Sequence, residues 1–396
     1  MGEQTEIAVI GAGPAGLIAA REAAKRGIDV TVFEEDSEIG VPCHCAGLLS
    51  LDGLKEIEVP LDDSYLQNRV RGAHFFSPSK LSFTVERREP VACVVNRSHF
   101  DRFLAEQAVR AGARLRLRSK IRTIKRVDGK ALLIVDSGEV KANVVIDAEG
   151  VASRLIREVG LRPLQTQNLL PALQYDLTGT SIDPDYVEIH TGRNLAPQFF
   201  VWVVPLNESS VRVGLGCKGT NPRERLEIFI KNRFKGENLT KIRTISGLLV
   251  TTGPIPRTFH DNFIAVGDVA GQVKPTTGGG VIWGGICAVL AGETGAEAVR
   301  HQTFSRDFLE NYETRWREKL GKEVSLTLHA RRILNRLSDK TLDMIFESVK
   351  RSNLQRELSA EGNMDFQAAS ILRLVKNRDI FKILVFYMKD LISQKQ

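Results

Sequence analysis

The spacing of apolar residues predicts alternating strands and helices at the start of the chain. Residues 6–10 (EIAVI) are apolar and end at a glycine, which indicates a short buried strand. An alanine-rich helical stretch follows to Arg26 and stops at Gly27, and residues 28–33 (IDVTVF) form a second apolar run. A strand, a helix and a strand in this order predict a parallel α/β unit.

Further along, apolar residues recur at two-residue spacing. Residues 59–95 and 166–255 carry this alternation, for example in FFVWVV and SVRVGLG, and predict an antiparallel sheet. Residues 113–146 predict a β-meander, because Asp-Gly and Ser-Gly pairs mark two turns within them. One helix interrupts the second alternating segment, with Asn221 as its cap and Pro222 at its first position.

A glycine-rich turn, GAGPAG, joins the first strand to the first helix. In this G-x-G-x-x-G pattern, Gly11 permits the tight turn, Gly13 lets a pyrophosphate approach the backbone, and Gly16 lets the helix pack close to the strand. The helix amino terminus then offers unpaired N–H groups and a positive dipole end to phosphates. Glu34, directly after the second strand, is placed to accept hydrogen bonds from ribose hydroxyls. Together these features predict a dinucleotide site, without separating FAD from NAD.

A second glycine cluster follows another short apolar strand. Residues 263–268 (FIAVGD) end in Gly-Asp, and a run of three glycines then precedes a helix of small residues. At its start, Gly279, Gly280 and Val281 are expected to present backbone N–H groups to something flat and electron-rich, such as the N1/C2=O edge of a flavin. Asp268 is then placed to hold the hydroxyls of a ribityl chain.

These two sites resemble those of the FAD-binding flavoproteins that share the fold of para-hydroxybenzoate hydroxylase. Residues 148–153 (AEGVAS) also resemble the Ala-Asp-Gly-x-x-Ser element of that superfamily, with Glu149 in place of the aspartate. Together with the motifs, the resemblance implies FAD as the cofactor. The cofactor-binding residues are then Gly11, Gly13, Ala15, Gly16, Glu34, Cys45, Ala46, Leu48, Arg97, Ile121, Asp268, Gly279, Gly280 and Val281.

Residues 96–101 (NRSHFD) look like the RxxFD element of the same superfamily, which implies that Arg97 contacts FAD. Without the family, Ser98 and Asp101 have the spacing of a helix N-cap and its partner three residues on. They predict a helix that runs to Gly112.

Two further stretches resemble geranylgeranyl reductases, including the archaeal enzymes that saturate the isoprenoid chains of membrane lipids. Residues 42–47 (PCHCAG) are similar to the PxxC-(G/A) element of that family, whose loop lies beside the flavin. Residues 200–205 (FVWVVP), followed by VGLG, look like its YxWxFP(K)…VGxG signature. Phe200, Val204 and Leu206 depart from the Tyr, Phe and Lys of that signature.

The resemblance implies an FAD-dependent reductase that saturates C=C bonds of geranylgeranyl chains, in archaeal-type membrane lipid biosynthesis. Phe200, Trp202 and Pro205 are the substrate-binding residues that it implies. Binding of an isoprenoid chain would rest on the hydrophobic effect, about 0.8 kcal/mol per buried CH₂. Without the family, the same alternation describes equally well a sheet whose aromatic residues pack in a core.

The predicted fold is α/β, with α+β character overall, in three parts. A Rossmann-like FAD-binding domain takes residues 1–58, 96–165 and 256–300, and a substrate-binding antiparallel sheet takes 59–95 and 166–255. Residues 301–396 have few turn signals and are predicted to be helical. The last helix, Asp379 to Ile392, is apolar and is expected to dock on the protein, with a membrane surface as the alternative.

The Cys-His-Cys tripeptide at 43–45 does not predict a metal site. A structural zinc needs four ligands, and the other cysteines stand alone at 93, 217 and 287, so we expect no metal and no disulfide framework. Cys45 and His44 are candidates for the catalytic proton donor, together with a bound water. An inert buried cysteine and a surface histidine are the alternatives.

The charge balance is basic, since 55 Lys and Arg against 48 Asp and Glu give +7. This favours an anionic partner, although acids and bases are interspersed as on an ordinary solvated surface. No motif supports nucleic-acid binding. No apolar run reaches the roughly 18 to 20 residues of a membrane-spanning helix, and no secretory signal is present. We therefore expect a cytoplasmic protein, with peripheral contact to the inner face of a membrane left open.

Two rival functions use the same residues. Flavin monooxygenases and halogenases share the fold, and the WxWxIP element of halogenases is about as close to FVWVVP as the reductase signature is. A non-catalytic prenyl-binding escort is the second rival, but such a protein loses the flavin site. For the reductase, the single full dinucleotide fingerprint suggests a transient electron donor, NAD(P)H or ferredoxin, and an isoprenoid lipid as the substrate.

Overall fold

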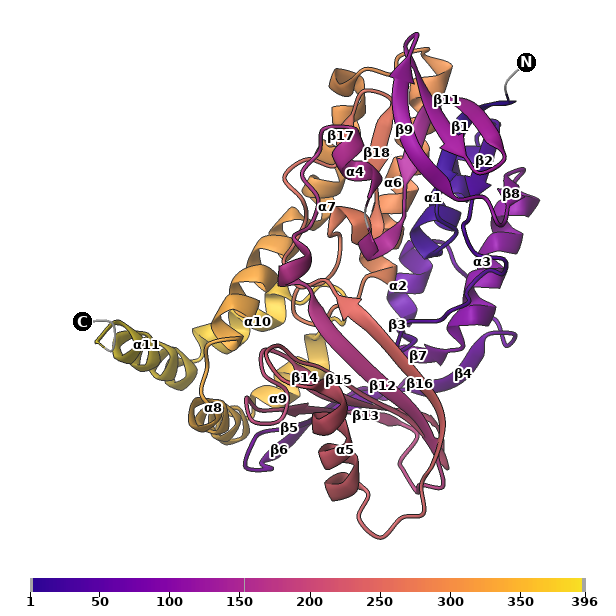
Figure 1. The fold of residues 1–396 in the computed structure, drawn as a ribbon. Helices are drawn as coiled ribbons and strands as arrows, with labels where there is room; N and C mark the ends of the chain where they lie inside the picture. Colours follow the sequence, from indigo (N-terminus) through magenta and orange to yellow (C-terminus); the bar gives the residue numbers. More distant parts are fainter. Residues whose placement is uncertain (1–2, 153, 394–396) are drawn as a thin grey trace.

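The computed structural model describes residues 3–152 and 154–393, and its first sheet is the α/β core that the sequence predicts (Figure 1). The strand order is β17-β18-β11-β1-β2-β8. The strands are β1 Glu3–Ile10, β2 Val30–Phe33, β8 Arg114–Arg116, β11 Gly138–Asp147, β17 Phe259–His260 and β18 Phe263–Ala265. Because β1 pairs in parallel with β2 and β11, and β11 with β18, the carboxyl ends of these strands meet at one edge.

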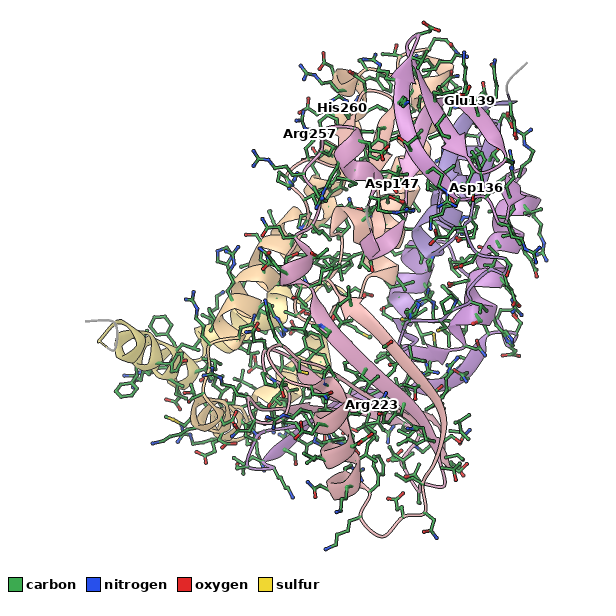
Figure 2. All side chains as sticks on the ribbon, in the orientation of Figure 1. Asp136, Glu139, Asp147, Arg223, Arg257 and His260 are labelled. Carbon is green, nitrogen blue, oxygen red and sulfur yellow. The ribbon has the colours of Figure 1, made fainter. Side chains whose placement is uncertain are left out.

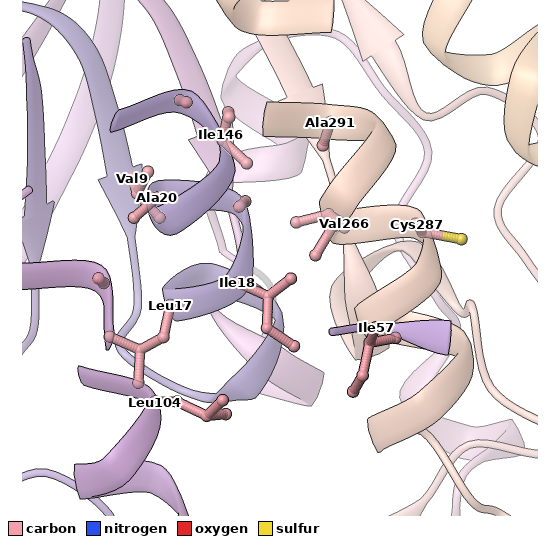
Figure 3. Packing of buried hydrophobic residues seen from close by; sticks show 14 of the residues in the cluster. Val9, Leu17, Ile18, Ala20, Ile57, Leu104, Ile146, Val266, Cys287 and Ala291 are labelled. Carbon is pink, nitrogen blue, oxygen red and sulfur yellow. The ribbon is translucent and has the colours of Figure 1, made fainter. Parts of the chain in front are cut away.

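Helices cover one face of this sheet and a meander covers the other. The helices are α1 Pro14–Ala24, α3 Arg97–Arg110 and α6 Val281–Arg300. Figure 3 shows Leu17 and Ile18 of α1, Val9 and Ile146 of the sheet and Ala291 of α6 in this packed layer. On the other face lie β9 Ile121–Val127 and β10 Lys130–Val135. The predicted turn between them is present, with both of its central residues, 128 and 129, at positive φ.

The second sheet has the order β16-β12-β15-β14-β13-β5-β6. Its strands are β5 Gly72–Phe76, β6 Ser82–Glu86, β12 Leu170–Thr178, β13 Tyr186–Thr191, β14 Phe200–Asn207, β15 Ser210–Gly216 and β16 Thr240–Leu249. It is antiparallel as predicted, except that β13 and β5 pair in parallel. Helix α5, Pro222–Arg233, packs on one face, and Asn221 caps it as predicted.

A third, small sheet lies between the first two, in the order β3-β7-β4. Its strands are β3 Leu48–Ser50, β4 Leu66–Val70 and β7 Ala92–Val95, and α2 Leu51–Glu56 follows β3. Of the strands within residues 59–95, only β5 and β6 join the large sheet. Strand β3 follows residues 42–47 directly, so this small sheet anchors one end of that loop.

The cap of α3 differs from the prediction. Asn96, and not Ser98, is the N-cap, because its side-chain oxygen accepts hydrogen bonds from the backbone N–H groups of Ser98 and His99. Ser98 instead donates its hydroxyl to the carbonyl of Gly40 at 2.7 Å. Asn96, two positions before Ser98, is also a favoured N-cap residue, and the prediction from the spacing of Ser98 and Asp101 overlooked it.

The remaining described residues are mainly helical. They form α4 Leu155–Glu158, α7 Arg306–Leu334, α8 Asp339–Arg351, α9 Leu354–Glu361, α10 Ala368–Lys376 and α11 Arg378–Ser393, with short turns η1 Gly150–Ala152, η2 Thr166–Asn168 and η3 Gly267–Ala270. Helices α8, α10 and α11 lie together at the end of the molecule that carries the C-terminus (Figure 1). Within residues 3–152 and 154–393, no helix has the length and apolar character needed to cross a membrane. Ser153 of the predicted 148–153 element lies outside the described residues.

Candidate functional site

The first glycine turn leaves an open space in front of α1. Gly11 has φ +93°, and a Cβ at Gly16 would lie 1.9 Å from the carbonyl oxygen of Gly11, so the helix packs tightly against the turn. A Cβ at Gly13 would meet no atom within 4 Å. Gly13 is also the N-cap of α1, and no side chain caps this helix. The turn therefore offers free N–H groups to an open space, which fits a pyrophosphate.

Glu34 joins this turn to the second strand. Its Oε2 accepts a hydrogen bond from the backbone N–H of Ala12 at 2.7 Å, and its Oε1 accepts one from Asp36 at 2.9 Å. The carboxylate is thereby fixed at the carboxyl ends of β1 and β2, where the remaining lone pairs can accept from ribose hydroxyls.

The second glycine cluster lies next to the first. Gly267, at the start of η3, has φ +78°, and a Cβ there would lie 2.9 Å from the methyl of Ala15 in α1. A Cβ at Gly280 would lie 2.4 Å from Oδ1 of Asp268. Gly280 is the N-cap of α6, which no side chain caps. The structure thus brings Ala15, Asp268 and the bare end of α6 to the same edge of the sheet.

Arg97 lies near Asp268. Its Nε and one terminal nitrogen donate to the two carboxylate oxygens of Asp101, both at 3.0 Å. Burial opposes the charge of Arg97, but Asp101 and the nearby thiols of Cys45 and Cys43 raise its pKa above the ordinary value. Burial raises the pKa of Asp268, and the positive charge of Arg97 opposes this shift. The RxxFD element therefore holds one cation close to both Cys45 and Asp268.

Residues 42–47 are fastened to the large sheet through their carbonyl groups. The carbonyl of Cys45 accepts from Nε2 of Gln174 at 2.9 Å, and the carbonyl of Ala46 accepts from Arg212 at 2.7 Å. Nδ1 of His44 lies 2.8 Å from the carbonyl oxygen of Ser246, and the His44 side chain is exposed. Strands β12, β15 and β16 thus hold the loop at successive points.

Gln174 connects this loop to the aromatic residues of β14. Its Oε1 accepts from Nε1 of Trp202 at 3.2 Å, while its Nε2 holds the loop. Gly214 leaves room for the indole, because a Cβ there would lie 2.5 Å from the ring of Trp202. Phe200 and Trp202 are half-buried and share a face of the sheet, since Val201 and Val203 point to the core under α5.

Some of the predicted residues lie elsewhere. The alternation along β14 puts Pro205 on the face opposite Trp202. Ile121 is 3% exposed, and its side chain lies within the core under the meander. Leu48 packs against the same buried cluster as Trp202, and Val281 begins α6. Among the residues that the structure describes, no group of three His, Cys, Asp or Glu side chains forms a metal-ligand set.

Comparison with known proteins identifies the family. The family model described as lycopene cyclase protein matches residues 6–343. A relative from Methanothermobacter thermautotrophicus, named digeranylgeranylglycerophospholipid reductase 2, is 33% identical over 379 residues, which cover 94% of this chain and 96% of the relative. The chain belongs to the digeranylgeranylglycerophospholipid reductase family. The resemblance read from residues 42–47 and 200–205 is thereby confirmed.

Solved structures agree with this assignment. A geranylgeranyl bacteriochlorophyll reductase-like protein from Thermoplasma acidophilum matches with a TM-score of 0.87 at 27% identity, covering 98% of this chain and all of that one. The halogenase PltM matches with a TM-score of 0.71 at 15% identity, over 99% of this chain and 96% of that one, and so shares the fold alone. As a member of the reductase family, the chain is an oxidoreductase with a flavin-binding fold.

Several residues of this reductase site escaped the sequence reasoning. Arg212 is 2% exposed and forms a two-point ion pair with Asp176, at 2.7 and 3.0 Å. Both are charged residues inside otherwise apolar strands, a signal that an inward-facing ion pair was present. Gln174, two residues before Asp176, is a buried polar residue in the same strand.

Asp147 is a further buried carboxyl at the same edge, inside the molecule at the end of β11 (Figure 2). Its Oδ1 accepts from the N–H of Glu149 at 3.1 Å, and its Oδ2 has no hydrogen-bond partner among the described residues. Burial, and then the charge of Glu149, raises the pKa of Asp147 well above its ordinary value. The folded protein therefore keeps a proton that the unfolded chain loses above about pH 4.

This shift predicts that stability is lost as the pH rises from about 4 towards the raised pKa of Asp147. Asp147→Asn removes the ionisation and is expected to stabilise the protein at pH 8 by about 1 kcal/mol or more, with little effect at pH 4. Melting temperatures of the two proteins at both pH values measure this. Glu139→Gln, at the exposed beginning of the same strand, is the control and is expected to leave the melting temperature unchanged at both pH values. An equal effect of Asp147→Asn at both pH values would contradict the prediction.

Proposed function

We propose that this reductase binds FAD and saturates C=C bonds of geranylgeranyl chains carried by a lipid, within archaeal-type membrane lipid biosynthesis. The observation that carries the proposal is the double role of Gln174, which holds the carbonyl of Cys45 and the indole of Trp202. Through it, the loop beside Arg97 and the aromatic face of the sheet form one continuous wall. A flavin at the glycine turns and an apolar chain on the sheet would then lie side by side.

The residues present fit FAD in particular, because the carboxyl edge of the first sheet carries groups suited to both halves of a dinucleotide. The open space at Gly13 would accept the pyrophosphate, Glu34 the ribose of the adenosine half, and Asp268 the ribityl hydroxyls. The bare amino terminus of α6 would face the ring edge of a bound flavin on which negative charge builds. When bound and reduced, FAD supplies the hydride, and the protein supplies position and electrostatics.

The substrate side rests on apolar contact and the exclusion of water. An isolated trisubstituted alkene has no carbonyl to accept charge, so its position and dry surroundings matter more than a strong acid. Phe200 and Trp202 supply the apolar surface. For the proton, Cys45 is the better candidate, since its Sγ lies within the loop beside Arg97 and accepts from the N–H of Gly47 at 3.3 Å. His44 is exposed and faces the carbonyl of Ser246.

We also propose a transient electron donor, NAD(P)H or ferredoxin, because only the first glycine turn carries the complete dinucleotide fingerprint.

The purified protein is expected to be yellow, and acid extraction should release FAD and not FMN. Colourless protein that cannot be reconstituted would favour the prenyl-binding escort. After anaerobic reduction, geranylgeranyl lipid should reoxidise the flavin, whereas substrate-stimulated oxygen consumption would favour the monooxygenase or halogenase.

Because the proposed substrate is a lipid, we also propose that the protein makes peripheral contact with a membrane. Leu372 of α10 and Phe381 and Phe386 of α11 expose 41%, 54% and 72% of their surface at the end of the molecule where these helices lie. Residues 368–387 carry four Lys or Arg and one Asp. Apolar side chains beside an excess of positive charge are the features by which surface helices bind anionic lipids.

Replacing both Phe381 and Phe386 by Asp is expected to reduce binding to anionic lipid vesicles about tenfold or more, because it removes apolar contact and adds negative charge. Vesicle sedimentation measures this, with reduction of a short, water-dispersed prenyl substrate as the activity control. Ile242→Asp, at a residue 66% exposed on β16, is the matched control and should leave binding unchanged. Equal binding of the wild type and the double variant would overturn the proposed contact.

A further inference from the structure

A buried ion pair joins the second glycine turn to the C-terminal helices. Nζ of Lys274 lies 2.7 Å from Oδ1 of Asp365, and the two side chains are 6% and 2% exposed. Lys274 precedes the three glycines of the turn, and Asp365 lies in the turn between α9 and α10. The partners are 91 positions apart in sequence, which explains why no sequence pattern indicated the pair.

The glycine turn is folded around Lys274. The backbone N–H of Lys274 donates to the carbonyl of Gly279 at 3.2 Å, and its carbonyl accepts from Gly278 at 2.8 Å. A Cβ at Gly279 would lie 2.9 Å from Cε and 3.4 Å from Nζ of Lys274. The end of the lysine side chain, with its ammonium group, therefore lies directly against the turn that begins α6.

Asp365 is held on the other side by contacts that leave it little freedom. Its carbonyl accepts from Nε1 of Trp283 in α6 at 3.1 Å, and its N–H donates to Oδ1 of Asn363 at 2.8 Å. A Cβ at Gly53 in α2 would lie 2.5 Å from its Oδ2. The segment around Asp365 is therefore packed between α2 and α6, where it fixes the position of the Lys274 ammonium.

Stability alone is a weak reason for such a pair. Desolvation of two charges costs about as much as their attraction returns, and apolar residues of the same volume would often stabilise the fold equally well. The pair instead places a fixed cation beside the glycine turn, with the counter-ion further from the turn than the cation is. Two-electron reduction of a flavin with uptake of one proton adds one negative charge, and a charge near N1 tunes its potential.

We propose that the Lys274–Asp365 pair is a positioning element that sets the glycine turn of residues 278–280 and holds a fixed cation beside it, and that this cation tunes the reduction potential of the flavin. The proposal rests on the proposed binding of FAD at this turn. It gives the C-terminal region a role at the redox site, since the counter-ion that fixes the lysine comes from the turn that leads into α10.

The test is the two-electron potential of the bound flavin in two opposite variants. Lys274→Met leaves the negative charge and is expected to lower the equilibrium constant for reduction about tenfold, which corresponds to about 30 mV. Asp365→Asn leaves the positive charge and is expected to raise it by a similar factor. The double variant should return close to the wild-type value. Equilibration with a redox dye under nitrogen, followed by flavin absorbance, measures all three.

A merely structural pair gives a different pattern. Arg233→Met, at the end of α5, breaks a partly buried pair with Glu188 and serves as the control for lost stability with an unchanged potential. Shifts of the same sign in Lys274→Met and Asp365→Asn, or none in either, would overturn the inference. If one of the single variants does not fold, Lys274→Arg takes its place, because it keeps the positive charge and should keep the wild-type potential. The double variant must still show a potential close to that of the wild type. Failure of the wild type to bind any flavin would instead overturn the proposed function.

Discussion

Gly13→Val is expected to abolish flavin retention while leaving the fold intact. Gly13 has φ −75° and ψ 176°, a conformation that valine adopts readily, and a Cβ there would meet no protein atom within 4 Å. The added side chain would occupy the space in front of α1 where a pyrophosphate approaches. We expect affinity for FAD to fall at least about 100-fold, roughly 2.7 kcal/mol. The stability of the flavin-free protein should change by less than about 0.5 kcal/mol.

Flavin absorbance of the purified variant and titration of the flavin-free protein with FAD measure this effect. Gly16→Ala is the informative comparison, because a Cβ there would lie 1.9 Å from the carbonyl oxygen of Gly11 and must distort the turn. That variant should lose both stability and flavin. Retention of FAD by Gly13→Val at the wild-type level would show that the phosphates lie elsewhere.

Arg212→Met is expected to destabilise the protein by about 3 to 5 kcal/mol, because it leaves the Asp176 carboxylate without its buried partner. Arg212 also donates to the carbonyl of Ala46 at 2.7 Å, so its loss should loosen residues 42–47. Burial raises the pKa of Asp176, but Arg212 and Arg243 outweigh it and hold the pKa below the ordinary value. Stability from the pair is therefore present above the unfolded pKa and is lost as the pH falls.

Arg243→Met is the matched control, since Arg243 pairs with the same carboxylate at 2.9 Å but is 41% exposed. Its loss should cost less than about 1 kcal/mol. Urea unfolding of the flavin-free proteins at pH 7 measures both changes. The difference in unfolding free energy between Arg212→Met and the wild type should become smaller at acid pH. Equal losses in the two variants would refute the assigned roles.

The motifs located the cofactor side of the site because each glycine there meets a requirement of the local backbone. Gly11 and Gly16 close a turn, and Glu34 follows a strand by fixed spacing, so neighbours along the chain suffice to predict them. Strands with alternating residues were likewise predictable, since burial on one face imposes the pattern. Family membership also followed from short motifs, at residues 42–47 and 200–205.

Contacts between distant segments were not predictable in this way. Gln174, Arg212 and Asp365 act on groups far away in sequence, and their positions depend on how strands and helices pack. Pro205 illustrates the reverse case, because the motif named it while the alternation along β14 turns it away from Trp202. The predicted cap of α3 was wrong because two polar residues close in sequence could both fill this role, and Asn96 is the residue that does.

The most direct test of the proposed activity is mass spectrometry of the lipid after contact with the reduced enzyme. The protein is reduced under nitrogen, mixed with a geranylgeranyl lipid and allowed to reoxidise. Hydrogenated products should appear as successive gains of two hydrogens, in proportion to the flavin reoxidised and absent with Gly13→Val. Reoxidation of the flavin without any hydrogenated lipid would contradict the assignment of this chain as a geranylgeranyl reductase.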